Sequence, residues 1–241
     1  MEEGKKVGEE NRYTKGEVLY FNKAKTWTSF DLVNKVRYLI RKELGVKKLK
    51  IGHAGTLDPL ATGVMIVCTG KATKKIESFQ YQTKEYIATL QLGSTTPSFD
   101  LETEIDATFP TEHITEDLLR ETLKTFIGEI QQIPPKYSAV KINGKRAYEY
   151  ARNGEDVEIK PKTLVIDEIE LLDFQEMRAV IRVVCSKGTY IRALARDIGE
   201  ALKSGAHLSD LERTRIGDIT LKECISIDDF KEIINKEKVN L

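Results

Sequence analysis

Residues 51–71, IGHAGTLDPLATGVMIVCTGK, constrain the fold of this chain more than any other segment. The apolar run 64–68 predicts a fully buried strand. The preceding loop contains an Asp-Pro pair, and Pro59 favours an extended backbone at Asp58. Two glycines in this loop permit backbone conformations that residues with a Cβ atom avoid, namely Gly52 and Gly55. The segment therefore predicts one carboxylate held at the mouth of a buried strand.

An Asp-Pro pair is a common turn signal, so the dipeptide alone does not indicate catalysis. The whole string GHAGTLDPLATG, however, resembles the catalytic loop of the pseudouridine synthases, within them the bacterial tRNA pseudouridine-55 synthase branch. The resemblance implies that Asp58 is the catalytic aspartate and that His53 contacts RNA. The structural alternative for His53 is an ordinary hydrogen-bonded loop histidine.

A second motif of this family is KEYIA, in which strand alternation places Tyr86 on the same face as Lys84 and Ala88. A lone tyrosine in a strand is usually a packing residue. The resemblance implies instead that Tyr86 lies against the target base, where an aromatic ring stacks on a flipped pyrimidine.

The third motif, CSKGTYIRALARD, places Arg192 in the first turn of a helix, where the dipole disfavours a cation unless an anion faces it. The structural alternative is an arginine in an ordinary surface ion pair. The resemblance makes Arg192 the partner of Asp58, because a guanidinium keeps a carboxylate ionised and oriented. It also implies that Tyr190 and Leu211 line the pocket for the base.

Residues 133–152 interleave basic and aromatic side chains, which is typical of an RNA contact. In the resembled family this segment is a mobile insertion that clamps the T-arm of tRNA. Its candidate RNA-binding residues are Lys141, Lys145 and Arg146. The alternative is a plain hairpin-and-helix lobe at the surface.

The segment KAKTWTS resembles the N-terminal motif of the family, with Ala24 and Thr26 in place of a proline and a glycine. These replacements weaken the expectation that Lys23 contacts substrate. Many relatives append an RNA-binding PUA-type domain, and we expect a short form that holds its tRNA without one.

The composition excludes several other classes of protein. The net charge is zero and 40% of the residues are hydrophobic, which is ample for a folded core. No apolar run approaches the ~20 residues of a membrane span. The three cysteines and three histidines show no metal-binding spacing, and no nucleotide-binding glycine motif occurs. We therefore expect a cytoplasmic protein with no metal, no cofactor and no membrane partner.

The pattern of segments predicts an α+β fold, and the resemblance implies a large mixed, mainly antiparallel sheet flanked by helices. We expect a disordered lead-in over 1–14, a single catalytic domain over 15–241 and an RNA-clamp insertion at about 133–160. A helix starting at Thr28 is predicted to bury Phe30 together with Val33. The other main elements are expected as strands at 17–21, 84–93, 164–173, 178–186 and 207–220, and as helices at 72–79, 115–126 and 189–203.

The resemblance implies conversion of uridine 55 in the T-loop of tRNA to pseudouridine, by a monomer that needs no guide RNA. Asp58 either attacks C1′ as a nucleophile or removes the C2′ proton, and the sequence does not separate these roles. Two other functions stay open, a guide-RNA-dependent pseudouridylase and a tRNA-folding chaperone.

Overall fold

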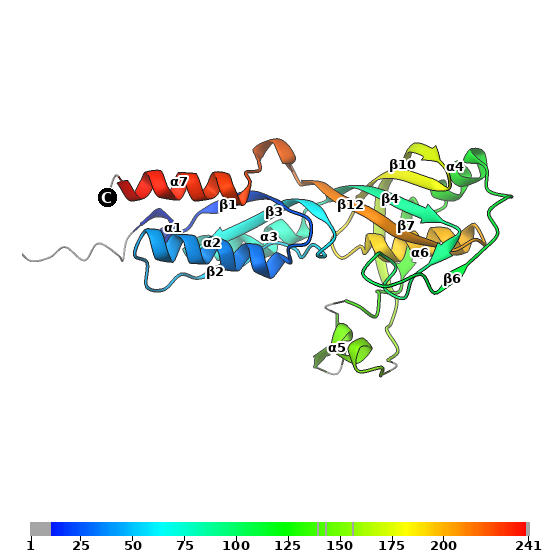
Figure 1. Cartoon of the computed structure of the whole chain (residues 1–241), viewed down its shortest axis with the longest axis horizontal. Coiled ribbons are helices and arrows are strands. Elements are labelled where there is room, and N and C mark those ends of the chain that lie inside the picture. Colours follow the sequence, from blue (N-terminus) through cyan, green and yellow to red (C-terminus); the bar gives the residue numbers. More distant parts are fainter. Residues whose placement is uncertain (1–10, 139, 143, 156, 240–241) are drawn as a thin grey trace, which may run out of the picture. The chain divides into compact units, whose positions relative to one another are not determined.

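The computed structural model describes residues 11–138, 140–142, 144–155 and 157–239. These residues form two compact units, which we describe separately. The terminal unit contains both ends of the chain, Met1–Gln82 and Glu212–Leu241, and is blue to cyan and orange to red in Figure 1. The central unit, Thr83–Leu211, contains the segments between them.

Strand β3 (Thr62–Thr69) is the centre of the terminal unit. It pairs antiparallel with β1 (Val18–Lys23) and with β2 (Ile51–His53). Near its start it also runs parallel to the last part of β12 (Ala206–Ile216), with Arg213 opposite Gly63. The chain then turns back into β13 (Ile219–Thr220).

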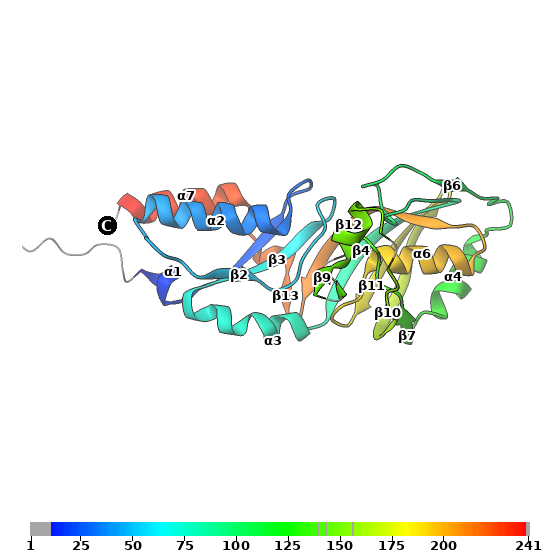
Figure 2. The same cartoon turned by 90° about the horizontal axis from the view of Figure 1, so that it is seen from below.

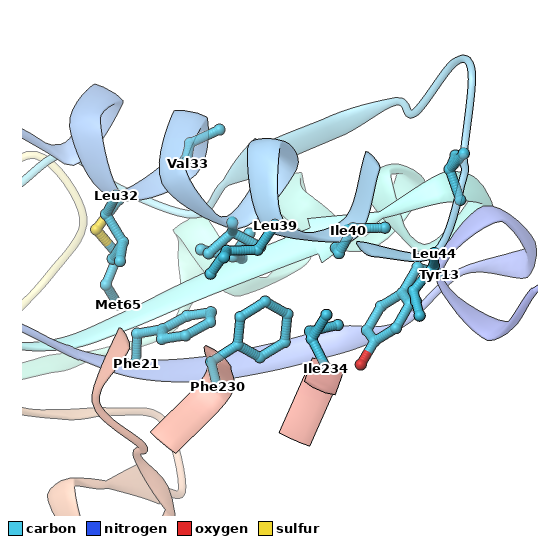
Figure 3. Close-up of a cluster of buried hydrophobic side chains, with 13 residues drawn as sticks. Tyr13, Phe21, Leu32, Val33, Leu39, Ile40, Leu44, Met65, Phe230 and Ile234 are labelled. Carbon is cyan, nitrogen blue, oxygen red and sulfur yellow. The ribbon is translucent and has the colours of Figure 1, made fainter. Parts of the chain in front are cut away.

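The side chains of β3 alternate between two apolar clusters, because successive residues of a strand point to opposite faces. On one face Met65 and Val67 pack under α2 (Ser29–Glu43) and α7 (Ile227–Val239). Figure 3 shows this cluster, in which the ring of Phe21 lies edge-on to that of Phe230 at 5.3 Å. The other face packs against η1 (Gly70–Lys75) and α3 (Ile76–Tyr81). A further short helix of this unit is η2 (Leu221–Glu223).

The sheet of the central unit contains a run of antiparallel strands, and the first part of β12 adjoins β4. The order of this run is β4 (Lys84–Leu92), β11 (Arg178–Cys185), β10 (Lys162–Gln175) and β7 (Gly128–Gln132). Helices α4 (Glu116–Lys124) and α6 (Ile191–Ala201) belong to the same unit, as Figure 2 shows. A short ladder joins β5 (Ser94–Thr95) to β6 (Ala107–Thr108). Between β7 and β10 the chain forms β8 (Lys141–Ile142), β9 (Lys145–Arg146) and α5 (Ala147–Arg152).

The prediction of an α+β fold with a mixed, mainly antiparallel sheet is confirmed. Within the described part of the chain, nine strands form one sheet: seven in the order β1-β3-β12-β4-β11-β10-β7, with β2 pairing with β3 and β13 with β12. Helix α2 begins as predicted, because Thr28 and Asp31 form a reciprocal capping box. The predicted insertion coincides with the hairpin β8–β9 and helix α5, which is also the shape of the surface-lobe alternative.

Two local predictions are wrong. The lead-in was expected to reach residue 14, but Arg12–Lys15 forms helix α1 and Tyr13 is fully buried; residues 1–10 lie outside the described part of the chain. Phe30 was expected in the core, but it is 66% exposed. The buried stripe of α2 includes Ser29 instead, because this hydroxyl is hydrogen-bonded to the backbone of the Asp58 loop.

Candidate active site

Asp58 lies in the loop that joins β2 to β3, here called the Asp58 loop (residues 54–61). Its side chain is half-buried, and its carbonyl accepts a hydrogen bond from the amide of Ala61 at 3.1 Å. Gly55 has a φ of +110°, which confirms that the loop needs a glycine there. Gly52 has no such angle, and a Cβ atom at this position would meet only the mobile end of a side chain, Cδ1 of Ile76 at 2.9 Å, so the structure shows no strict need for glycine there.

Lys23 is hydrogen-bonded to the backbone of the Asp58 loop and of the segment before α2. Its side chain is fully buried, and its ammonium group donates to the carbonyls of Ala24, Trp27 and Pro59 at 3.0, 2.6 and 3.3 Å. Burial lowers the pKa of Lys23 to about 8, although the charge of nearby Asp58 opposes that shift. The side chain therefore stays protonated at neutral pH, with three donors for three carbonyls. These contacts give Lys23 a positioning role, and its predicted contact with substrate stays a prediction.

Two residues of the α2 N-terminus also hold the loop. The hydroxyl of Ser29 donates to the carbonyl of Leu57 at 3.0 Å and accepts from its amide at 2.8 Å. The amide of Thr26 donates to the carbonyl of Pro59 at 2.8 Å. Both neighbours of Asp58 are thus hydrogen-bonded to one other segment, which restricts the directions open to its carboxylate.

His53 is the last residue of β2, one strand step before the Asp58 loop. Burial lowers the pKa of its imidazole below the ordinary value of 6.5, so the ring is neutral at pH 7. Its Nδ1 atom is buried and has no hydrogen-bond partner among the described residues. A backbone hydrogen bond at Gly55 opposes this lowering of the pKa, so both the RNA contact and the hydrogen-bonded loop histidine stay predictions.

In the central unit, Tyr86 lies on β4, whose residues alternate in burial as predicted. Tyr86, Lys84 and Ala88 share the buried face of this strand, and Tyr86 is opposite Val183 of β11. The pairing of β4 with β11 is continuous from Lys84 to Gln91, so the backbone that carries the ring is firmly held.

Arg192 lies in the first turn of α6, and the anion that the sequence required there is Asp100. Nε of Arg192 is 3.4 Å from Oδ2 of Asp100, and both side chains are almost fully buried. The guanidinium also donates to the carbonyls of Ser98 and Tyr137, each at 3.0 Å. Sequence reasoning missed Asp100, because it follows a non-repetitive turn in which nothing marks one acid among several.

Replacement of Asp100 by asparagine is expected to destabilise the central unit and impair any function of Arg192. The change keeps the size of the side chain but leaves the buried guanidinium without a counter-charge, which costs on the order of 3 kcal/mol. Asp106→Asn is the matched control, because that carboxylate is exposed. Urea unfolding of both variants checks the prediction, and equal midpoints would show that Asp100 does not balance Arg192.

Tyr190 is the N-cap residue of α6, and its backbone is held by Gln132. The buried amide side chain of Gln132 accepts from the Tyr190 amide at 2.9 Å and donates to its carbonyl at 3.2 Å. The segment that carries both Tyr190 and Arg192 is therefore fixed to the end of β7. Leu211 lies near the middle of β12 and is buried, as an apolar wall requires.

The predicted RNA-clamp residues lie on the β8–β9 hairpin. Lys145 and Arg146 are exposed, and the ammonium of Lys145 is 5.7 Å from the ring centre of Tyr150. Lys141 is in β8, opposite Arg146 in the ladder. The hairpin thus presents cations beside an aromatic ring, which suits the stacking and phosphate contacts of an RNA-binding surface.

The predicted site residues fall into two groups. The terminal unit contains Lys23, His53 and Asp58, with Lys23 opposite Gly63 at the start of β3 and His53 opposite Val67 further along it. The central unit contains Tyr86, Tyr190, Arg192 and Leu211. The pairing of Arg192 with Asp58 stays a prediction. Within the described ranges no group of His, Cys, Asp or Glu side chains is arranged to hold a metal ion. No helix in the described part of the chain combines the length and apolar character needed to cross a membrane.

Comparison with solved structures identifies the class of fold. The chain resembles a protein in the crystal structure of a Cbf5-Nop10-Gar1 complex, with a TM-score of 0.67 and 30% sequence identity. The match covers 91% of this chain and 54% of the other, so this chain spans about half the length of that protein. The sheet and its helices therefore share the architecture of that protein.

Sequence comparisons narrow the class to one family. Residues 41–191 match the N-terminal domain of TruB family pseudouridylate synthases, and residues 192–240 match the C-terminal domain of tRNA pseudouridylate synthase B. The chain belongs to the TruB family of pseudouridylate synthases. It is 73% identical over 220 residues to tRNA pseudouridine synthase B of Parabacteroides distasonis, covering 90% of this chain and 94% of the relative. The same enzyme of Phocaeicola vulgatus is 68% identical over 227 residues, covering 94% and 97%.

Proposed function

We propose that this protein converts uridine 55 in the T-loop of tRNA to pseudouridine. The observation that carries the proposal is the Asp58 loop, where Lys23 and Ser29 fix the backbone on both sides of one half-buried carboxylate. Relatives with about two thirds or more of their residues identical to this chain are named tRNA pseudouridine synthase B.

The proposed reaction is an isomerisation. The target nucleotide flips out of the RNA, and the bond between C1′ and N1 of uracil breaks. Asp58 assists this step, either as the nucleophile at C1′ or as the base at C2′. The uracil turns and bonds to C1′ through C5; N1 gains a proton and C5 loses one. Atoms and electrons balance without a cofactor or a second reactant.

The other site residues are assigned by the same proposal. Tyr86 stacks on the flipped base, while Tyr190 and Leu211 form the apolar walls of its pocket. Arg192 pairs with Asp58 and keeps its carboxylate ionised and oriented. His53 contacts the RNA; its ring is neutral at pH 7, so this contact is by stacking or hydrogen bonding rather than by charge.

The proposed partner is the T-arm of tRNA, bound by a cytoplasmic monomer without a guide RNA. The exposed cations of the β8–β9 hairpin, Lys145 and Arg146, supply phosphate contacts, and Lys141 is assigned to the same surface. Without a guide RNA, the protein itself must bind the tRNA and select the uridine, and this requires a binding surface outside the catalytic residues.

Neutralising the hairpin by Lys145→Gln with Arg146→Gln is expected to weaken tRNA binding and its dependence on salt. The slope of log K against log salt should fall by up to about 0.9 for each phosphate that the hairpin no longer neutralises, or about 0.7 where the RNA is unpaired. The single-turnover rate at saturating tRNA should change much less. The control is Lys231→Gln with Lys236→Gln, which removes two exposed cations from α7. If the plots of log K against log salt coincide for the hairpin variant and the α7 control, the hairpin is an ordinary surface lobe and does not bind tRNA.

The decisive experiment incubates the purified protein with an unmodified tRNA transcript and maps pseudouridine by chemical modification. We expect one new pseudouridine at position 55, and none in a transcript with cytidine there. Modification only after addition of a guide RNA would favour the guide-dependent alternative. Faster tRNA folding without any pseudouridine would favour the chaperone.

A further inference from the structure

Arg213 is the largest of the fully buried side chains and lies at the base of the Asp58 loop. It is on β12, opposite Gly63 in the parallel pairing with β3. Only 1% of Arg213 is exposed, so its guanidinium does not reach solvent or RNA. A buried guanidinium is costly unless its donors are used, which makes their partners informative.

The donors of Arg213 go to three backbone carbonyls on the two sides of the loop. Nε donates to the carbonyl of Val64, in the strand after the loop, at 2.8 Å. The two terminal nitrogens donate to the carbonyls of Gly55 at 3.1 Å and Thr56 at 3.5 Å, which lie in the first part of the loop. One rigid planar group thus joins the strand that leaves the loop to the residues that enter it. Asp58 lies in the segment that this group closes.

The backbone around Arg213 fixes where its guanidinium lies. Gly63 has a φ of +110°, and a Cβ atom there would be 2.2 Å from the carbonyl oxygen of Arg213. The two strands therefore approach more closely than any residue with a side chain allows. Because β12 is held at this distance, the reach of Arg213 to the three carbonyls is set by the sheet rather than by the loop.

The charges around the loop are also unusual. Within the described residues no carboxylate forms an ion pair with Arg213, and Lys23 directs its donors to carbonyls as well. Lys23 lies close enough to both Arg213 and Asp58 for each charge to act on it. Two buried cations thus lie beside the loop, and the carboxylates whose charges act on Lys23 are those of Asp58 and Asp31.

We propose that Arg213 is a positioning residue, which closes the base of the Asp58 loop and thereby sets the direction of the Asp58 carboxylate. The inference rests on the proposed function, since the carboxylate has to meet C1′ or C2′ of the flipped nucleotide. A displacement of about 1 Å of a reacting group lowers a rate by roughly 10²-fold. Loss of the guanidinium should therefore act on the chemical step and not on the capture of tRNA.

The test compares Arg213→Lys and Arg213→Gln with Arg41→Met, which removes an exposed arginine of α2. For the two Arg213 variants we expect a single-turnover rate at saturating tRNA lower by about 10²-fold, a tRNA Kd within a few-fold of wild type, and faster hydrogen exchange confined to residues 54–61. Arg213→Lys should retain more activity than Arg213→Gln, because it keeps the charge. Arg41→Met should match the wild type.

A normal single-turnover rate in both Arg213→Lys and Arg213→Gln would overturn the inference. An equal loss of affinity and rate would also overturn it. In either case an active wild-type protein would still support the proposed function. If neither variant shows native circular dichroism at low temperature, Arg213 is a folding residue and the inference also fails. An inactive wild-type protein would instead refute the proposed function itself.

Discussion

Replacement of Asp58 by asparagine should abolish pseudouridine formation and leave tRNA binding within a few-fold of wild type. Asparagine has nearly the same size, so the loop and its hydrogen bonds to Lys23 and Ser29 should persist. An amide neither attacks C1′ nor accepts the C2′ proton at neutral pH, so both mechanisms lose their essential group. The measurement is single-turnover conversion of a tRNA transcript at saturating enzyme, with affinity from filter binding.

Asp228→Asn is the matched control for this variant, because it removes an exposed acid from α7 of the same unit. It should show the wild-type rate. Appreciable turnover by a folded Asp58→Asn protein would remove Asp58 from the chemistry. A large loss of affinity without loss of the single-turnover rate would instead make Asp58 a binding residue.

Replacement of Gly63 by alanine should strongly destabilise the protein. Its φ of +110° disfavours any side chain, and the added Cβ atom would meet the Arg213 backbone at 2.2 Å. Backbone cannot move aside as a flexible side chain does, so β3 and β12 would have to separate. We expect a loss of at least about 3 kcal/mol in the free energy of unfolding, measured by urea denaturation.

Gly45→Ala separates the two causes of this loss. Gly45 follows α2 with a φ of +66°, but nothing lies within 4 Å of a Cβ atom built there. Its replacement should cost only the conformational penalty, about 1–2 kcal/mol. Equal losses at Gly45 and Gly63 would show that the strands tolerate the extra atom, and that the close approach does not fix Arg213.

Local signals in the sequence determined the elements of this fold. Strand alternation gave the face of Tyr86, and the Thr28 capping box gave the start of α2. The positions of the Asp58 loop and of the insertion were predicted from continuous sequence motifs. Such signals act over a few residues, through backbone geometry and periodic burial, and they need no knowledge of the tertiary structure.

The tertiary structure alone decided what holds the site together. Arg213 meets Gly55 across 158 residues, Arg192 meets Ser98 across 94, and Gln132 meets Tyr190 across 58. No periodicity encodes such pairs, because they depend on which strands become neighbours in the sheet. The same is true of Lys23, for which the family resemblance implied a contact with substrate. A charge is normally exposed, and only the three carbonyls that the fold brings around this ammonium make its burial possible.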